Sequence, residues 1–301
     1  MAEGEFRCGY IGLVGRPNVG KSTLLNRMVG QKISITSRKP QTTRHRILGI
    51  KTTDTAQMIF VDTPGLHKAE KNRMNRFMNK AALTTIQDVD LILFMIDAGK
   101  WTGEDDTVLD YIRRSRRPVI LLINKVDRSK DKATLLPFIR EVSEKYAFTD
   151  VIPISARQGD NLEVLEEKIT AMLPASPPIF DPEQVTDRSM RFIAAESIRE
   201  KLMRGLGQEV PYQLTVEIER YREEKNFIQI NAVIWVERDN QKAIVIGKQG
   251  SRLKEAGTQA RKELEKMTDK KVNLELWVKV RSGWLDDERS LRSLGYADDE
   301  F

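Results

Sequence analysis

Short apolar runs alternate with segments of helical periodicity over the first 173 residues. Four of these runs are apolar on both faces, which is typical of strands buried in a parallel sheet. The runs are "GYIGLVG", "RILGI", "AQMIFVD", "LILFMID", "VILLINK" and "VIPIS", and the helical segments between them include "KSTLLNRMVG", "NRFMNKAALTTI", "EDDTVLDYIRRS", "ATLLPFIREVSEKY" and "NLEVLEEKITAML". The alternation predicts a doubly wound α/β domain, with a mostly parallel sheet and helices on both faces.

A proline-rich segment, "LPASPPIFDPEQVTDRS", follows this pattern. Four prolines within nine residues cannot continue a helix or a central strand. They are Pro174, Pro177, Pro178 and Pro182. We therefore place a linker at residues 175–187, between a first domain at 1–174 and a second domain at 188–301.

The second domain has a different order of elements. Two long runs, "QLTVEIERYREE" and "FIQINAVIWVER", are joined tightly at Lys225-Asn226 and predict a hairpin. A predicted helix precedes the hairpin and another follows it. Apolar residues alternate along "VNLELWVKV", which predicts a final strand. The helical stripes are Phe192, Ala195, Ile198, Leu202 and Leu206 in the first helix, and Leu253, Gly257, Ala260, Leu264 and Met267 in the second. This order predicts a smaller α+β domain.

Composition narrows the class of protein. A chain of 301 residues is long enough for about two domains, and 40% hydrophobic with 31% charged residues predicts a soluble globular protein rather than a disordered one. The sequence has one cysteine, Cys8, and two histidines. We therefore expect neither an internal disulfide nor a Cys/His metal site. Neither a signal peptide nor a membrane-spanning run is evident.

The net charge of +6 is unevenly distributed. Residues 242–281 carry 11 basic and 5 acidic side chains, whereas residues 282–301 carry 2 and 6. This pattern indicates either a face that binds a polyanion or an ordinary solvated surface.

The stretch "GRPNVGKS" at residues 15–22 has the spacing of a phosphate-binding loop. Gly15 and Gly20 allow the backbone N–H groups to point inward at phosphate oxygens, and the next helix adds its positive dipole end. Lys21 would reach the β- and γ-phosphates, and Ser22 would ligate Mg²⁺. A strand before the loop and a helix after it favour this interpretation over a simple glycine-rich turn.

The motif "NKVD" at residues 124–127 identifies the base. It follows the apolar run "VILLI", so it stands at the carboxyl end of a strand, where α/β sheets bind ligands. The Asp127 carboxylate can accept from the N1–H and 2-amino groups of guanine, a pattern that adenine lacks. Asn124 would contact the other edge of the base, and the stem of Lys125 would cover its face.

Three further motifs complete the expected site. "FVDTPG" supplies Asp62 for Mg²⁺ and Gly65 for the γ-phosphate, and "QTTRHR" supplies a threonine in the polar stretch before the second strand. "ISA" could present backbone N–H groups to the guanine oxygen. Each motif is weak by itself, but their order is that of a guanine-nucleotide switch.

These five motifs resemble those of a translation-factor-class GTPase. The resemblance implies that Thr42 or Thr43 senses the γ-phosphate, with Thr43 favoured because it precedes Arg44. It implies catalytic roles for Lys21, Thr43 and Gly65, and Mg²⁺ ligands in Ser22, Thr43 and Asp62. The implied nucleotide-binding set is Gly15, Arg16, Pro17, Asn18, Val19, Gly20, Lys21, Ser22, Thr23, Thr42, Asp62, Thr63, Pro64, Gly65, Leu66, Asn124, Lys125, Val126, Asp127, Ser155 and Ala156.

One residue departs from the pattern of many small GTPases. Leu66 stands where they carry a glutamine that orients the attacking water. Backbone groups and waters could do this instead, or a partner or cation could complete the site. Because Leu66 cannot orient the attacking water, we expect slow intrinsic hydrolysis. Asn18 resembles the asparagine with which related GTPases bind K⁺, so we also expect a K⁺ site at Asn18.

The stretch "VIGKQG" contains a G-x-x-G turn before a basic helix. Such a turn lets a nucleic-acid backbone approach closely, and an apolar wall beside it can hold unstacked bases. By charge alone the site could also face DNA or an anionic membrane, or be an ordinary loop. With the hairpin and the final strand, the arrangement resembles a type II KH domain. The predicted RNA-binding residues are Ile244, Ile246, Gly247, Lys248, Gln249, Gly250, Arg252 and Lys254.

The order of a phosphate-loop GTPase, a short linker and a KH domain resembles the Era GTPase family over the whole chain. The resemblance implies GTP/GDP with Mg²⁺ as cofactors, and as partners the 3′ end of small-subunit ribosomal RNA and the 30S subunit. It implies a role in late maturation of that subunit. It also implies a monomeric cytoplasmic protein with peripheral association at the inner membrane.

Two other functions remain open from the sequence. A GTPase coupled to RNA modification would need a further reactive residue, and nothing after residue 180 supplies one. An RNA-binding adaptor with a structural nucleotide would show no turnover even with RNA present.

Overall fold

The computed structural model describes residues 5–37, 39, 41–65, 73–129, 135–207 and 210–296. The chain forms two compact units. The first comprises Met1–Ser34, Thr43–Glu70 and Met78–Asp187, and the second comprises Ile35–Thr42, Lys71–Phe77 and Arg188–Phe301. The two short segments at 35–42 and 71–77 therefore belong to the second unit, although the surrounding chain belongs to the first.

A six-stranded sheet forms the centre of the first unit, with the strand order β2-β3-β1-β4-β5-β6. All neighbouring strands pair in parallel except β2 and β3, which are antiparallel. The predicted doubly wound, mostly parallel sheet is thus confirmed. The strands are β1 (Arg7–Val14), β2 (Ile47–Thr52), β3 (Ala56–Asp62), β4 (Leu91–Asp97), β5 (Val119–Asn124) and β6 (Asp150–Pro153).

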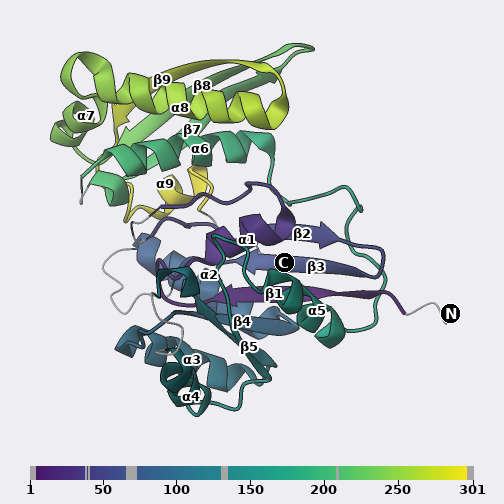
Figure 1. Cartoon of the computed structure of the whole chain (residues 1–301). Helices are drawn as coiled ribbons and strands as arrows, with labels where there is room; N and C mark the ends of the chain where they lie inside the picture. The colour runs from purple at the N-terminus through teal and green to yellow at the C-terminus, as the bar shows by residue number, and fades with distance from the viewer. Residues whose placement is uncertain are drawn as a thin grey trace. The chain divides into compact units, whose positions relative to one another are not determined.

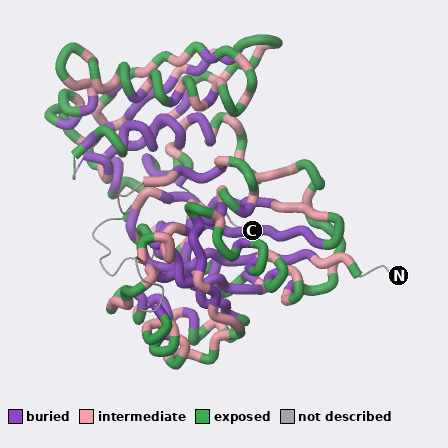
Figure 2. The backbone as a smooth tube through the Cα atoms, viewed as in Figure 1, coloured by how far each residue is buried: buried purple, intermediate pink, exposed green. Residues whose placement is uncertain are grey.

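Helices cover both faces of this sheet (Figure 1). Apolar residues of α2, α3 and α4 pack in one cluster against β4 and β5, and α1 and α5 lie on the other face. Both β3 and β5 are buried along their whole length, as Figure 2 shows for the strands of the sheet. The helices are α1 (Lys21–Val29), α2 (Arg73–Asp88), α3 (Gly103–Ser115), α4 (Leu135–Ser143) and α5 (Leu162–Met172).

The predicted linker segment runs along the first unit and bonds to its strands. Backbone bridges join Arg7 to Ala175 and Gly49 to Thr186. In addition, the N–H of Ile50 donates to the carbonyl of Val185 at 2.9 Å. The segment therefore adds short β-like pairings to the edge of the first unit.

A three-stranded sheet with the order β7-β8-β9 forms the second unit. The hairpin pair β7–β8 is antiparallel and β8–β9 is parallel, as the predicted α+β fold requires. The elements are α6 (Met190–Gly205), β7 (Leu214–Glu223), β8 (Phe227–Val236), α7 (Asp239–Ile246), α8 (Ser251–Thr268), β9 (Lys271–Val280) and α9 (Glu288–Ser293).

The core of this unit differs in detail from the predicted helical stripes. Ala194, not Phe192, begins the buried stripe of α6 that continues through Ile198 and Leu202. On α8 the buried residues are Ala256, Ala260 and Leu264, whereas Met267 is exposed. The predicted stripes are therefore correct at Ile198, Leu202, Ala260 and Leu264, whereas Phe192 and Met267 lie outside the buried core.

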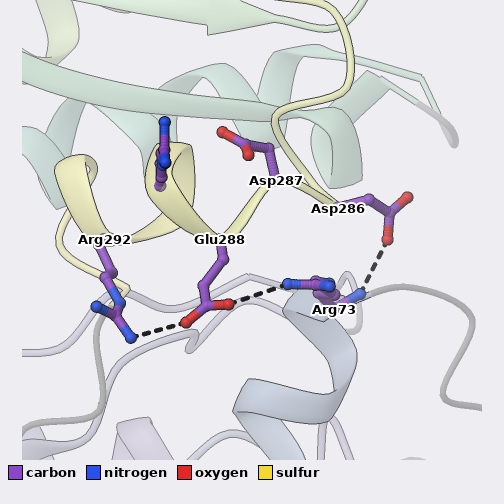
Figure 3. Close-up of a pocket in the computed structure, with 6 residues that line it drawn as sticks. Arg73, Asp286, Asp287, Glu288 and Arg292 are labelled. Carbon is purple, nitrogen blue, oxygen red and sulfur yellow. Dashed lines mark hydrogen bonds and ion pairs between the residues drawn. The ribbon is translucent and has the colours of Figure 1, made fainter.

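Figure 3 shows a polar pocket of about 370 Å³ in the second unit, beside α9. The backbone N–H of Arg73 donates to Asp286 at 3.0 Å, and its guanidinium pairs with Glu288 at 3.1 Å. Glu288 also pairs with Arg292 at 2.7 Å. The charges that line the pocket largely satisfy one another.

Candidate functional site

The predicted phosphate loop connects the carboxyl end of β1 to the start of α1. Lys21 is buried, and its Nζ donates to the carbonyls of Gly15 and Arg16 at 2.9 and 3.1 Å. Burial lowers the pKa of Lys21 to about 8, against the attraction of Asp62. The loop thus holds a cation inside a ring of backbone groups, which suits a phosphate ligand.

Three glycines of the site leave no room for a side chain. A Cβ on Gly15 would stand 2.5 Å from the carbonyl oxygen of Met95, and one on Gly20 would stand 2.3 Å from Nδ2 of Asn124. Both residues also have positive φ. A Cβ on Gly65 would meet Pro17 at 2.9 Å. The close approach of neighbouring atoms, together with the positive φ of Gly15 and Gly20, requires glycine at these positions.

Ser22, Thr43 and Asp62 come together beneath the loop. The Ser22 hydroxyl donates to Asp62 Oδ2 at 2.7 Å and lies 2.8 Å from the Thr43 hydroxyl. Ser34 also donates to Asp62 Oδ2, at 2.8 Å. The hydroxyl of Thr42 instead donates to the carbonyl of Lys39 at 2.6 Å. The structure thus places Thr43, and not Thr42, with the other predicted Mg²⁺ ligands.

The arrangement fits a magnesium ion. Asp62 Oδ1 is buried and accepts no hydrogen bond from the described residues, although its other oxygen accepts several. Burial raises the pKa of Asp62, while Lys21 and the neighbouring hydroxyls oppose that rise. One carboxylate with two hydroxyls is the small set of hard oxygen ligands that Mg²⁺ takes when phosphates supply the others.

The base-recognition motif begins at the carboxyl end of β5, and Asn124 is buried there. Its Nδ2 donates to the carbonyl of Val19 at 2.7 Å, and its Oδ1 accepts from the N–H of Ala156 at 3.0 Å. Ser155 donates to Asp127 at 2.7 Å. The side chain of Asn124 therefore joins the phosphate loop, the NKVD motif and the ISA motif, three segments more than a hundred residues apart at their extremes.

Other predicted residues of the nucleotide site belong to its supporting framework or to its loops. Val126 and Asp127 form a short 3-10 turn, and the Thr63 hydroxyl donates to the carbonyl of Leu13 at 3.0 Å. Thr63 and Asn124 are buried parts of the framework, whereas Arg16 points away from the loop. Leu66 lies outside the described residues.

The fold also brings Ser34, Asp97 and Asp105 to this site, although none of them belongs to a predicted motif. Asp97 ends β4 just as Asp62 ends β3, so its position at a strand's carboxyl end was an available signal. Ser34 carries no such signal, because only the path of the chain after α1 brings it to Asp62.

The G-x-x-G turn forms a helix–turn–helix with α7 and α8 in the second unit. Gly247 and Gly250 have φ of 74° and 75°, and a Cβ on Gly247 would stand 2.8 Å from that of Arg252. Arg252 donates to the carbonyl of Ile244, which closes the turn. Lys248, Gln249 and Lys254 are exposed, and Ile244 is 40% exposed. Ile246 is half-buried against the core.

Together, these features define a GTP-binding protein of the phosphate-loop class that also carries a KH domain. The family model described as "50S ribosome-binding GTPase" matches residues 10–125, and that of the KH domain matches residues 209–285. GTPase Era of Pseudomonas fluorescens is 55% identical over 97% of both chains, and that of Histophilus somni is 56% identical over 99% of this chain and 100% of its own. The chain belongs to the Era GTPase family and is a GTPase.

Solved structures agree with this assignment over both units. Era in complex with MgGDPNP and nucleotides 1506–1542 of 16S ribosomal RNA superimposes with a TM-score of 0.93 at 42% identity, covering 97% of this chain and 99% of its own. An Aquifex aeolicus Era variant bound to GDP·AlF4⁻ has the same TM-score at 41% identity, covering 97% and 100%. In the described part of the chain, no helix is long and apolar enough to cross a membrane.

Proposed function

We propose that this chain is a guanine-nucleotide switch that binds the 3′ end of 16S ribosomal RNA through its KH domain and acts in maturation of the small ribosomal subunit. The observation that carries the proposal is full-length similarity to an Era structure holding both MgGDPNP and that RNA. Residues 1–174 would form the switch and residues 188–301 the RNA-binding part, with 175–187 as the linker.

In the nucleotide site, Ser22, Thr43 and Asp62 would hold Mg²⁺, which neutralises charge on the β- and γ-phosphates. Lys21 would cradle the same phosphates, and the Gly65 N–H would reach the γ-phosphate. Asp127 and Asn124 would select guanine. GTP would order the segments around Thr43 and Asp62, and hydrolysis would release them, so that nucleotide state controls RNA binding.

Guanine selection can be tested by Asp127→Asn. This variant should lose GTP affinity and gain affinity for xanthosine triphosphate, whose base lacks guanine's donor pattern. Ser155→Ala removes one hydrogen bond to Asp127 but keeps its carboxylate, so it is the matched control and should keep guanine selectivity. Unchanged selectivity in Asp127→Asn would refute the role assigned to that carboxylate.

RNA binding can be tested with a single-stranded oligonucleotide from the 16S 3′ end. Lys248→Glu with Lys254→Glu should weaken binding at least ten-fold and reduce its salt dependence, because both lysines would contact phosphates. Lys262→Glu with Lys266→Glu makes the same charge change farther along α8 and should have a smaller effect. Equal losses in both variants would show that only net charge matters.

The coupling and the cation site need separate measurements. GTP hydrolysis should be slow alone and should respond to the RNA; no turnover in any condition would instead favour the adaptor with a structural nucleotide. We also propose K⁺ binding at Asn18, whose φ is 65°. Asn18→Gly keeps this backbone conformation and should abolish any excess of the rate in KCl over that in NaCl.

The same proposal includes a monomeric state and peripheral association with the inner membrane. Light scattering of the full chain tests the first. Co-flotation with vesicles containing anionic lipids tests the second, and recovery of all protein in the unbound fraction at low salt would contradict it.

A further inference from the structure

Arg16 lies in the phosphate loop, but its side chain is directed at two aspartates. Its Nη2 donates to Asp97 Oδ2 at 2.7 Å, and its Nε donates to Asp105 Oδ2 at 3.2 Å. The Arg16 side chain is 10% exposed and that of Asp105 is completely buried. Arg16 can therefore contribute only backbone groups to a phosphate. Its guanidinium anchors the loop to Asp97 at the end of β4 and to Asp105 in α3.

Asp97 joins the phosphate loop to the base-recognition motif. One carboxylate oxygen pairs with Arg16, and the other lies 2.5 Å from Nζ of Lys125. The same Nζ donates to the carbonyl of Asn18 at 2.6 Å. The Lys125 side chain is thus fixed at its far end by two partners, and its aliphatic stem is held in place where it would cover the guanine ring.

Asp105 fixes the other end of this chain of contacts. Its Oδ2 accepts from both the N–H and the hydroxyl of Thr102, at 2.9 and 2.8 Å, which forms the capping box at the start of α3. The oxygen that caps the helix is the one that accepts from Arg16. Helix α3, at residues 103–115, thereby provides a rigid support for the loop.

We infer that Asp97 is a positioning residue that sets the lifetime of the bound guanine nucleotide. It acts through Arg16 on the phosphate loop and through Lys125 on the cover over the base. The inference rests on the nucleotide site proposed above, and it extends that site to β4 and α3. Asp97 and Asp105 would act on the nucleotide only through Arg16 and Lys125, without touching it.

Removing the Asp97 charge has a specific consequence. Arg16 keeps Asp105, and Lys125 keeps the carbonyl of Asn18, so the fold and both motifs persist. Arg16 nevertheless loses one of its two charged partners, and Lys125 loses the ion pair that it forms beside its hydrogen bond to the carbonyl of Asn18. Both side chains are poorly exposed, where interactions with a charged group are stronger than at the surface. Nucleotide release should become faster, while the guanine selectivity set by Asp127 should not change.

The test is the release of fluorescently labelled GDP from the full-length protein with Mg²⁺, chased with excess GDP. Asp97→Asn should release GDP about ten-fold faster than the parent protein. The ratio of GDP to xanthosine diphosphate affinity should remain that of the parent. Asp97→Glu, which keeps the charge, should restore at least part of the lifetime.

Glu166→Gln provides the matched control. Glu166 of α5 pairs with Lys51 at 2.5 Å, both side chains are partly buried, and neither residue belongs to the five motifs. It should leave GDP release unchanged. If Asp97→Asn released GDP within two-fold of the parent rate, or if Glu166→Gln accelerated release as much, the inference would be overturned.

A second variant keeps the inference testable if Asp97→Asn does not fold. Arg16→Gln removes both ion pairs of the loop but leaves Asp97 with Lys125, so it should accelerate release of GDP and GTP alike. An unchanged lifetime in this folded variant would equally overturn the inference. Loss of all guanine-nucleotide binding in the parent protein would contradict the proposed function instead.

Discussion

Gln57 and Phe180 form two reciprocal hydrogen bonds. The Gln57 side chain donates to the carbonyl of Phe180 at 2.8 Å and accepts from its N–H at 2.9 Å. The same oxygen accepts from the N–H of Ile179 at 2.8 Å. Gln57 is completely buried on β3, so it acts as an internal clamp on the proline-rich segment. This segment is therefore fixed to the first unit by side-chain bonds as well as by strand-like pairing.

Replacing Gln57 with leucine should release that clamp. Two backbone N–H groups would lose their acceptor, and we expect a loss of about 2 kcal/mol in the free energy of unfolding. Amide exchange at Ile179 and Phe180 should accelerate more than exchange in β1. Gln184→Ala, a half-exposed change within the segment, is the control, and equal acceleration in both variants would argue against the clamp.

A methyl group at Gly20 should be far more damaging than one at Gly30. A Cβ on Gly20 would stand 2.3 Å from Asn124 Nδ2, whereas a Cβ on Gly30 would meet nothing within 4 Å. Both residues have positive φ, so alanine at either position adds backbone strain of about 1 kcal/mol. Only alanine at position 20 also has a steric conflict. Gly20→Ala should reduce GDP affinity at least a hundred-fold, and Gly30→Ala should reduce stability by about 1 kcal/mol with near-normal affinity. Calorimetric titration with GDP measures both, and comparable affinities would contradict the steric argument.

Nucleotide binding should take up protons near pH 8. In the free protein burial lowers the pKa of Lys21 from 10.5 to about 8, so about half of these side chains are neutral at that pH. Phosphate beside the ammonium group favours the charged form and raises this pKa. Binding of MgGDP should therefore take up about half a proton at pH 8 and about a tenth at pH 7. Titration calorimetry in buffers of different ionisation enthalpy measures the number, and zero uptake at pH 8 would contradict the lowered pKa.

The lowered pKa of Lys21 also determines how its contribution to stability changes with pH. Because the folded-state pKa of Lys21 is depressed, the unfolded chain binds more protons between about pH 8 and pH 10.5. The contribution of Lys21 to the stability of the nucleotide-free protein should thus become more favourable as the pH rises through that window. Chemical denaturation with and without MgGDP separates this contribution, because it should be largely absent from the complex.

The two glycines of the G-x-x-G turn should respond differently to alanine. At Gly247 a Cβ would clash with Arg252, whereas at Gly250 it would meet nothing within 4 Å. Gly247→Ala should open the turn and weaken binding of the 16S 3′-end oligonucleotide at least ten-fold, beyond the strain of about 1 kcal/mol that both changes share. Fluorescence anisotropy measures the affinities, and a larger loss in Gly250→Ala would contradict this order.

Local patterns predicted much of the fold because they record burial directly. The runs "AQMIFVD" and "LILFMID" coincide with β3 and β4 as observed, since strands buried on both faces consist mainly of apolar residues. Helix phases were predicted less well. Met267 fits the spacing of a buried stripe but is exposed, because helical periodicity does not show where along the helix its contacts with the sheet end.

The sequence by itself determined the chemistry of the nucleotide site, because a phosphate loop and an NKxD motif carry their function in short contiguous stretches. Only the tertiary structure decided which threonine meets Ser22 and Asp62, and that Arg16 turns to Asp97 and Asp105. It also decided that Gln57 clamps the proline-rich segment. These pairings join residues between 19 and 123 positions apart. No local pattern encodes them, because they depend on the paths by which segments distant in the sequence meet in the folded chain.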